Sequence, residues 1–461
     1  MELFDHQEHT AVFLTNTPRA WVQSDPGTGK TISTLEAFRR WRRDGGQGRM
    51  LVLAPLSILK PSWGDDIAKW LGDEFTYSIA YAKNRLEAFL SGADIIITNH
   101  DAVKWATKKE NARFMHEAFP DDQEHWLVID EATAFKNATS QRSKAMLTLR
   151  TYFDRRIAMS GTPTAKDVLD IFHPTLIIDD GEHLGNKFFQ FRNQVTDPIQ
   201  VGPDPKMVKW VAKDGAEEHV AQALADICIR YRFEDCLDIP ANQTLTYHVD
   251  LSPKQRALYL QMLETNVVEN DDGERVTAVN AGVRVRKLLQ LLTGAVYNGD
   301  GDVTTFHQDR YDLVMQLVQE REHSLVAFNW KHEVEALTKL ADKLKIPYGV
   351  IDGSVKNEDR IKVVEDFQAG RLQVVFAHPQ SAGHGLTLTK GTATIWCSPT
   401  YNAEHYQQFN RRIYRAGQTQ ATQTIHIAAR DTAEEQVYEQ LEGKLTRMDD
   451  LLALFQQRTA A

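Results

Sequence analysis

The residues with the most specific chemistry form one glycine-rich stretch, Ser24-Asp25-Pro26-Gly27-Thr28-Gly29-Lys30-Thr31. Because Gly27 and Gly29 carry no Cβ, the backbone N–H groups around them can converge on phosphate oxygens. Lys30 can reach the outer phosphates of a nucleotide with its ammonium group, and the Thr31 hydroxyl can contact Mg²⁺. This spacing predicts a phosphate-binding loop.

The residues on either side of the loop support this prediction. The apolar run Ala20-Trp21-Val22 predicts a strand before it, and residues 32–41 predict a helix after it. A helix that begins at the loop adds the positive end of its dipole to the site. The strict motif has glycine at the position of Ser24, and a plain glycine turn is the alternative interpretation.

A pair of carboxylates, Asp130-Glu131, directly follows the apolar run Trp126-Leu127-Val128-Ile129. Two acids at the end of a strand suit a carboxylate that holds Mg²⁺ beside one that activates water. The alternative is two surface acids after a strand. The upstream loop favours the catalytic interpretation.

A pair of arginines, Arg412 and Arg415, is a candidate for the other side of a nucleotide. They lie three positions apart, so on a helix they would share one face. Their guanidinium groups stay charged and bind phosphate oxygens in a bidentate way, as the developing charge of phosphoryl transfer requires. The alternative is a solvated basic helix.

The elements that must position these residues follow two alternating series. Apolar runs at residues 49–55, 93–100, 126–131 and 156–163 alternate with helix-like stretches, and this order predicts a doubly wound parallel sheet. Ligands bind such sheets at the carboxyl ends of the strands, where the polar residues lie.

A second series of apolar runs begins after a helical region. The runs lie at residues 324–330, 348–353, 372–377 and 394–398, and no second phosphate loop accompanies them. Helices are expected at residues 3–15, 217–229, 284–292, 359–368 and 432–452. We therefore expect an α/β chain with two doubly wound lobes and a nucleotide held between them.

These motifs, in this order, resemble the Swi/Snf-type ATPases of helicase superfamily two. Residues 25–31 resemble D-x-G-x-G-K-T, and residues 130–137 resemble D-E-A-H-x-x-K-N with Thr133 in place of the histidine. Further similar strings are Ser160-Gly161-Thr162-Pro163, the link at residues 230–240, L-S-x-x-Q-x-x-L-Y at 251–259, G-x-G-L-N-L at 383–388, W-N-P at 401–403 and Q-x-x-x-R-x-x-R-x-G-Q at 408–418.

The resemblance implies ATP and Mg²⁺ as cofactors and two RecA-like lobes with helical insertions. It implies that Lys30, Glu131, Arg412 and Arg415 are catalytic, and that Thr31 and Asp130 hold the metal. It places the other nucleotide contacts at Gln7, Asp25, Gly27, Thr28, Gly29, Gly385 and Gln418. For Gln7, an amide that contacts the adenine edge competes with a surface glutamine.

The expected domains follow the same family pattern. They are an ATP-binding lobe at 1–175, a helical insertion and link at 176–245, a helical protrusion at 246–305, a second lobe at 306–435 and a bracing helix at 436–461.

Nucleic-acid contacts are expected at polar strand ends away from the nucleotide. The candidates are Lys60, Ser62, Thr98, Asn99, Asn329, Lys331, Gly353 and Ser354. Such backbone contacts carry no base specificity. Ordinary loop residues are the alternative for all of them.

Composition sets further limits. Of 461 residues, 42% are hydrophobic and 25% are charged, as in ordinary globular proteins, and the net charge is −10. This charge argues against a surface coated with DNA-binding residues but allows a local basic cleft. The three cysteines, Cys228, Cys236 and Cys397, fit reduced thiols in a cytoplasmic protein. We expect a monomer and no membrane span.

The resemblance implies a DNA-dependent ATPase that translocates on double-stranded DNA and displaces or remodels bound proteins without separating the strands. It implies a motor without added targeting domains. Two alternatives remain at this point: a strand-separating or annealing helicase of the same superfamily acting on DNA or RNA, and a non-catalytic nucleic-acid-binding scaffold.

Overall fold

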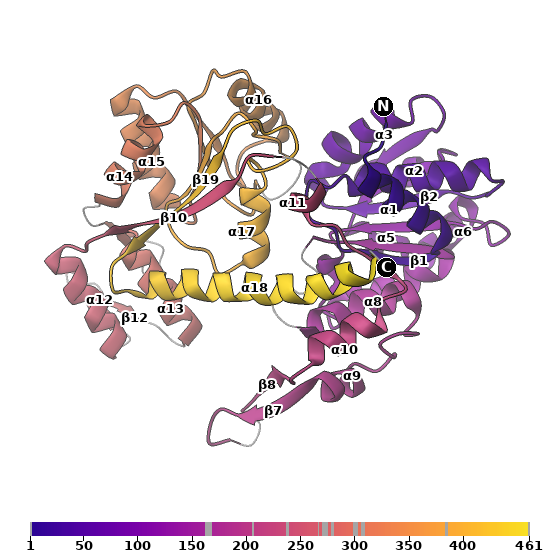
Figure 1. Ribbon diagram of the computed structural model, residues 1–461, viewed down its shortest axis with the longest axis horizontal. Coiled ribbons are helices and arrows are strands. Elements are labelled where there is room, and N and C mark those ends of the chain that lie inside the picture. Colours follow the sequence, from indigo (N-terminus) through magenta and orange to yellow (C-terminus); the bar gives the residue numbers. More distant parts are fainter. Residues whose placement is uncertain are drawn as a thin grey trace. The chain divides into compact units, whose positions relative to one another are not determined.

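The computed structural model describes residues 2–161, 168–204, 207–236, 239–265, 267–269, 275–277, 281–297, 303–305, 309–382 and 386–459 (Figure 1). The chain divides into two units. The first comprises Met1–Asp238 with Thr446–Ala461, and the second comprises Ile239–Leu445. Within the described part of the chain, no helix is both long enough and apolar enough to cross a bilayer.

The first unit is built on a seven-stranded sheet in which all neighbouring strands are parallel. Its strand order is β3 (Tyr77–Ala80), β4 (Ile95–Asn99), β2 (Met50–Ala54), β5 (Trp126–Asp130), β6 (Arg155–Met159), β1 (Arg19–Val22) and β9 (Cys228–Ile229). The register places Val22, Met159 and Asp130 side by side at the ends of three neighbouring strands. The segments that follow these strands therefore begin at one edge of the sheet.

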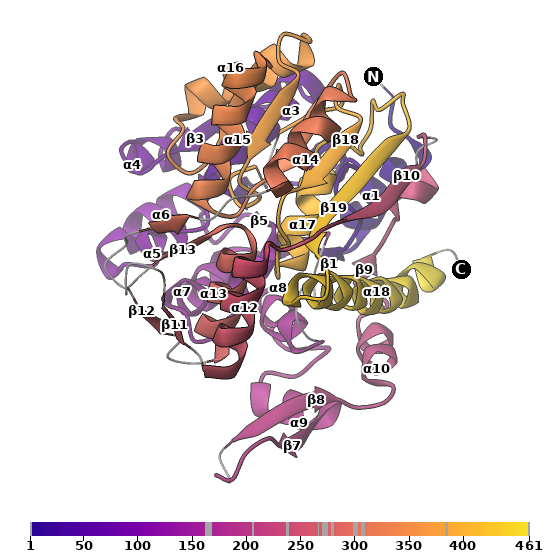
Figure 2. The ribbon, with the colours of Figure 1, turned by 90° about the vertical axis from the view of Figure 1, so that its left-hand side faces the viewer.

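Helices pack against both faces of this sheet. Side chains of α1 (Asp5–Asn16), α2 (Lys30–Arg43) and α3 (Asp65–Trp70) pack into one apolar cluster with Val22, Val52 and Val128 of the sheet. The other helices of this unit are α4 (Arg85–Phe89), α5 (Ala102–Ala106), α6 (Ala112–Ala118), α7 (Gln141–Leu149), α8 (Phe172–Asp179), α9 (Phe188–Val195), α10 (Ala216–Ala223) and α11 (Phe233–Cys236). Figures 1 and 2 both show the hairpin of β7 (Thr196–Gln200) and β8 (Val208–Ala212) extending away from the sheet with α9.

The second unit is built on a six-stranded parallel sheet. Its strand order is β10 (Asn242–Val249), β19 (Thr422–Ala429), β18 (Ala393–Trp396), β15 (Ser324–Ala327), β17 (Val374–Ala377) and β16 (Tyr348–Ile351). Alternate residues of one strand face opposite sides. Val326 packs with α14 (Asp309–Gln319) and α15 (Lys331–Leu344), and Leu325 packs with α16 (Asn357–Gln368), α17 (Ala403–Asn410) and α18 (Ala433–Thr459).

A helical pair adjoins this second sheet. The helices α12 (Pro253–Thr265) and α13 (Ala281–Leu292) lie side by side in both ribbon views and share an apolar cluster with Val437 of α18 (Figures 1 and 2). Two short antiparallel ribbons also lie in this unit, β11 (Val267–Glu269) with β12 (Arg275–Thr277), and β13 (Ala295–Tyr297) with β14 (Val303–Thr305).

The two doubly wound sheets confirm the expected fold class. All the apolar runs that were expected to form strands are strands, with ends shifted by a few residues. One helix is corrected: residues 217–229 form a helix only as far as Ala223, and Cys228–Ile229 is strand β9. Among the strands of the two parallel sheets, β3, β9, β10 and β19 were not expected from the sequence, and neither were the strands of the three antiparallel ribbons.

Candidate functional site

The glycine-rich stretch forms a loop between β1 and α2. Gly27 (φ 90°) and Gly29 (φ 84°) both adopt left-handed backbone conformations, which glycine takes up without the steric cost of a Cβ. Gly29 is the residue that precedes α2, so the helix begins at Lys30 with its first N–H groups directed toward the loop. This is the local geometry that an anion-binding loop requires.

Lys30 folds back over this loop. Its Nζ donates to the backbone carbonyl oxygens of Ser24 at 2.7 Å and Asp25 at 3.1 Å. Burial lowers the pKa of Lys30, and the nearby carboxylates of Glu131 and Asp130 oppose this shift. The ammonium group therefore lies within electrostatic reach of the acidic pair that follows β5.

Asp130 is the last residue of β5, and its carboxylate is fixed by two donors. Trp63 donates its Nε1–H to Oδ2 at 2.9 Å, and the backbone N–H of Glu131 donates to Oδ1 at 3.1 Å. Burial raises the pKa of Asp130, whereas the Trp63 hydrogen bond and Lys30 lower it. Trp63 is a residue that sequence reasoning missed, because nothing in its local sequence connects it to the strand end.

Glu131 adopts a left-handed backbone conformation with φ 53°, which is unfavourable for a residue with a side chain. His100 supports this turn by donating from Nε2 to the Asp130 carbonyl oxygen at 2.8 Å. Burial lowers the pKa of His100 to about 4, so its ring is neutral near pH 7. Backbone strain of this kind persists where the surroundings fix it, often at active sites.

The Ser160-Gly161 pair follows β6 and meets the loop. A Cβ added to Gly161 would lie 2.6 Å from Cδ of Pro26, so only glycine fits this close approach. The Ser160 N–H donates to the Val22 carbonyl oxygen at 3.0 Å and continues the pairing of β6 with β1. Thr162 and Pro163 of the same motif lie outside the described residues.

Gln7 lies against the loop rather than on the surface. Only 8% of it is exposed, its Nε2 donates to the Thr28 carbonyl oxygen at 3.3 Å, and a Cβ on Gly29 would collide with its amide. Thr28 itself is buried, and its hydroxyl donates to the Asp25 carbonyl oxygen at 2.8 Å. The surface interpretation of Gln7 is wrong, and an adenine contact stays a prediction.

The Asp25 carboxylate joins the loop to residues 230–233. Its Oδ1 pairs with Arg230 at 3.1 Å, and its Oδ2 accepts from the Phe233 N–H at 3.1 Å. These two contacts hold the loop in place, and a direct contact with a nucleotide remains a prediction.

The donor set of the first unit fits ATP and Mg²⁺. The two left-handed glycines and the start of α2 provide the cradle, Lys30 provides a cation, and Asp130 provides a fixed carboxylate oxygen beside it. Oxygen ligands of this kind suit Mg²⁺, which binds through one or two carboxylates together with phosphates. Thr31, in the first turn of α2, has the hydroxyl that such loops direct to the metal.

In the second unit, the two arginines converge on one carbonyl group. The Arg412 and Arg415 NH1 atoms donate to the Leu386 carbonyl oxygen at 3.1 Å and 3.0 Å. The expectation that they share a helix face is wrong, because α17 ends at Asn410 and both lie in the turns that follow. The turns nevertheless direct both guanidinium groups to the same segment, residues 386–388.

Gln418 is held by the backbone around it. It is 5% exposed, and its amide donates to the Thr389, Gly391 and Ile413 carbonyl oxygens while it accepts from the N–H groups of Thr419 and Gln420. These contacts close the turn after the arginines, and a contact with the nucleotide stays a prediction. Gly385, the remaining predicted contact, lies outside the described residues.

The predicted nucleic-acid contacts differ in exposure. Lys60, Lys331, Gly353 and Ser354 are exposed, and Ser62, Asn99 and Asn329 are half-buried. Thr98 is a correction: it is fully buried, and its hydroxyl donates to the Ala80 carbonyl oxygen at 2.8 Å, so its side chain does not reach the surface.

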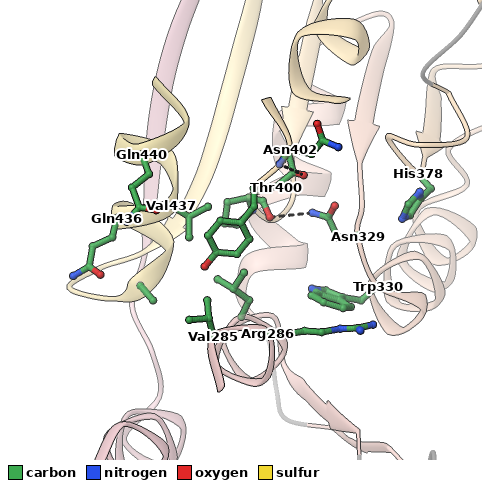
Figure 3. A pocket seen from close by; sticks show the side chains of 14 residues that line it. Val285, Arg286, Asn329, Trp330, His378, Thr400, Asn402, Gln436, Val437 and Gln440 are labelled. Carbon is green, nitrogen blue, oxygen red and sulfur yellow. Dashed lines mark hydrogen bonds between the residues drawn. The ribbon is translucent and has the colours of Figure 1, made fainter. Parts of the chain in front are cut away.

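Asn329 also borders a cavity of about 720 Å³ at the carboxyl ends of β15, β17 and β18 (Figure 3). Its amide donates to Ser398 Oγ at 2.9 Å, which holds the side chain in place. Arg286 lies over the Trp330 ring at 5.4 Å, and Tyr401 borders the same space. Among the described residues that line this cavity, Arg286 carries a fixed charge and none is acidic.

Comparison with known proteins finds two family matches along the chain, the first of which continues beyond Asp238 into the second unit. Residues 19–294 match the SNF2-related domain family, and residues 309–417 match the helicase conserved C-terminal domain family. Protein p41 of Acyrthosiphon pisum secondary endosymbiont phage 1 is 28% identical over 96% of both chains. The human DNA repair and recombination protein RAD54-like is 22% identical over 92% of this chain, and Arabidopsis thaliana protein CHROMATIN REMODELING 24 is 24% identical over 90%.

The chain spans nearly all of the phage relative but 61% of the human and 43% of the plant relative. Among solved structures, the Sulfolobus solfataricus SWI2/SNF2 ATPase core in complex with double-stranded DNA is 20% identical, with a TM-score of 0.45 over 98% of this chain and 93% of that one. The SNF2-related match covers more than half of the chain, so this protein belongs to the SNF2-related family and is an ATP hydrolase of the helicase and translocase class.

Proposed function

We propose that this ATPase uses Mg²⁺ and ATP to translocate along double-stranded DNA and that it displaces or remodels bound proteins without separating the strands. The observation that carries the proposal is the set of groups at one edge of the first sheet. The phosphate loop, Asp130-Glu131 and Ser160-Gly161 follow three neighbouring strands whose last residues are in register. Hydrolysis chemistry is thereby supported within the first unit.

The proposed roles follow from the contacts of each side chain. Lys30, now on the Ser24 and Asp25 carbonyl oxygens, would turn to the outer phosphates of ATP. Asp130 and Thr31 would hold Mg²⁺, which neutralises charge on the phosphate oxygens when bound. Glu131 would orient the attacking water and accept its proton.

The arginine pair of the second unit has a proposed role in the same reaction. Arg412 and Arg415 would bind the phosphate charge that develops during transfer, an effect worth about 10³-fold or more in related NTPases. Their convergence on Leu386 supports this role, since two guanidinium groups at one segment can act together.

Exposed residues of both units support a contact with the DNA backbone. Lys60 and Lys331 present ammonium groups, and Gly353-Ser354 presents backbone and hydroxyl groups after β16. Phosphate contacts of this type are independent of base sequence. The names of the relatives, which include DNA repair and chromatin remodelling, are consistent with a DNA substrate.

The test is the ATPase rate with double-stranded DNA, single-stranded DNA and RNA at one stated salt concentration, because such binding depends strongly on salt. We expect the largest stimulation with the duplex. A triplex displacement assay then separates the modes of action. Release of the third strand with an intact duplex supports the proposal, and ATP-dependent separation of the duplex favours the helicase alternative.

The scaffold alternative is tested with Glu131→Gln. This change keeps the shape of the side chain but removes the carboxylate that would accept a proton. We expect ATP binding to persist while turnover falls by about 10²-fold or more. Wild-type turnover in this variant would remove Glu131 from the mechanism, and ATP binding without hydrolysis by the wild-type chain would support a scaffold.

A further inference from the structure

Residues 227–231 of the first unit pair with the backbone that leads from β1 into the phosphate loop. Beyond the short strand β9, the pairing with the β1 segment continues. The N–H groups of Trp21, Gln23 and Asp25 donate to the carbonyl oxygens of Ile227, Ile229 and Tyr231 at 2.7, 2.9 and 3.0 Å. The backbone is therefore hydrogen-bonded to this neighbouring segment as far as Asp25.

Side chains strengthen this pairing where the loop begins to turn. Arg230 is 1% exposed, and its NH1 contacts both Asp25 Oδ1 at 3.1 Å and the Gln23 carbonyl oxygen at 2.9 Å. The other carboxylate oxygen of Asp25 accepts from the Phe233 N–H. One buried carboxylate thus joins the loop to two points of residues 230–233.

Ser24, which departs from the strict glycine motif, belongs to the same arrangement. Its hydroxyl oxygen accepts from the Tyr231 N–H at 3.0 Å, a contact that glycine could not make. The structure therefore gives this departure a physical reason.

Ser24 and Asp25, which residues 230–233 hold, also position Lys30. The carbonyl groups that accept from Lys30 Nζ belong to Ser24 and Asp25, whose side chains residues 230–233 hold. A buried ion pair adds little net stability because both charges lose their hydration, but it fixes geometry strictly. Displacing residues 230–233 would displace the backbone that positions Lys30.

We infer that Arg230 is a positioning residue for ATP hydrolysis, which acts through Asp25 on the phosphate loop. Together with Ser24 and Tyr231, it makes the loop geometry depend on residues 230–233, shortly before the chain enters the second unit at Ile239. Arg230 has no role in the chemistry itself. Its function is to keep Lys30 and the loop backbone where the phosphates must bind.

The test compares Arg230→Gln, Arg230→Lys and Ser24→Ala. The matched control is Arg156→Gln, since Arg156 is a buried arginine of the same unit that pairs with Asp180 near the start of β6, away from the loop. For each variant, the Kd of a fluorescent non-hydrolysable ATP analogue, kcat, KM and the urea unfolding midpoint are measured.

We expect Arg230→Gln to lower kcat/KM by about 10²-fold, as small displacements of positioned groups do. Arg230→Lys should recover part of this loss, because lysine keeps the charge but not the forked geometry. Ser24→Ala should weaken analogue binding by about two- to tenfold, the range for one hydrogen bond. Arg156→Gln should shift the urea midpoint and leave the nucleotide constants unchanged.

Wild-type nucleotide constants in folded Arg230→Gln and Ser24→Ala would overturn the inference. So would an equal loss of kcat/KM in Arg156→Gln, because the effect would then reflect stability alone. If Arg230→Gln does not fold, Ser24→Ala decides: weakened analogue binding supports the inference, and unchanged binding refutes it.

Discussion

The substitution Trp63→Phe removes the N–H donor that fixes the proposed metal-binding carboxylate. Trp63 is fully buried, and its Nε1–H donates to Asp130 Oδ2 at 2.9 Å. A hydrogen bond to a charged group contributes about 1.5–3 kcal/mol, and phenylalanine cannot replace it. This loss corresponds to a change of about 10- to 100-fold in the affinity of the charged Asp130 carboxylate for Mg²⁺. Removing a group that hydrogen-bonds to a metal ligand typically lowers metal affinity by the same factor.

The direction of the pH effect follows from the same contact. Burial already raises the pKa of Asp130, and the Trp63 hydrogen bond acts against that shift. Its removal raises the pKa further, so the carboxylate becomes protonated at a higher pH. The acidic limb of the kcat/KM profile should therefore move to higher pH in Trp63→Phe.

The assay is the Mg²⁺ concentration that gives half-maximal ATPase activity, measured at neutral pH. The control is Trp41→Phe, because Trp41 is also buried and donates its Nε1–H to a carboxylate, Glu124 Oε2, at 3.0 Å. We expect the Mg²⁺ requirement to rise about 10- to 100-fold in Trp63→Phe alone. Equal Mg²⁺ requirements in the two variants would refute the reasoning.

Three further predictions concern the second unit and pH. Gln418→Ala should destabilise the protein by about 2–4 kcal/mol in urea unfolding, because it removes hydrogen bonds to the backbone. The KM for ATP should stay unchanged. A raised KM with unchanged stability would instead indicate a contact between Gln418 and the nucleotide. Burial raises the pKa of Glu333 to about 7 from 4.5. The free energy of unfolding should therefore fall by up to about 3 kcal/mol as pH rises from 4.5 through 7. A Glu333→Gln variant whose stability has the same pH slope would contradict this. Burial lowers the pKa values of His100, His332 and His426 to about 4 from 6.5. Their contribution to the free energy of unfolding is fully present above pH 6.5 and should be lost as pH falls toward 4. Urea unfolding midpoints that do not change over this range would argue against neutral buried rings.

The sequence predicted most of the sheet framework because central parallel strands are continuous apolar runs. β2, β4 and β5 are of this kind, with nearly every residue buried. The edge strands β3 and β10 have mostly exposed or half-buried residues, so they lack that signal. β19 was missed although it is central, because threonine, glutamine and histidine interrupt its apolar pattern.

The site was predictable where its residues are adjacent in sequence. The phosphate loop, the acidic pair and the glycine of Ser160-Gly161 are local motifs. The partners that hold them come from distant segments: Trp63 and His100 contact Asp130, and Arg230 contacts Asp25, only because of the strand order. A motif match also does not separate a ligand contact from a structural amide: the motif predicts that Gln418 contacts the nucleotide, and in the structure its amide holds the turn after the arginines.

The most direct test of the proposed role of the arginine pair is single-turnover hydrolysis by Arg415→Ala, measured beside the Kd of a non-hydrolysable ATP analogue. Arg415 is half-buried, and its NH1 donates to the Leu386 carbonyl oxygen at 3.0 Å. The substitution leaves every residue of the phosphate loop unchanged. We expect an unchanged Kd and a hydrolysis rate lower by about 10³-fold. A wild-type hydrolysis rate in the folded variant would contradict it.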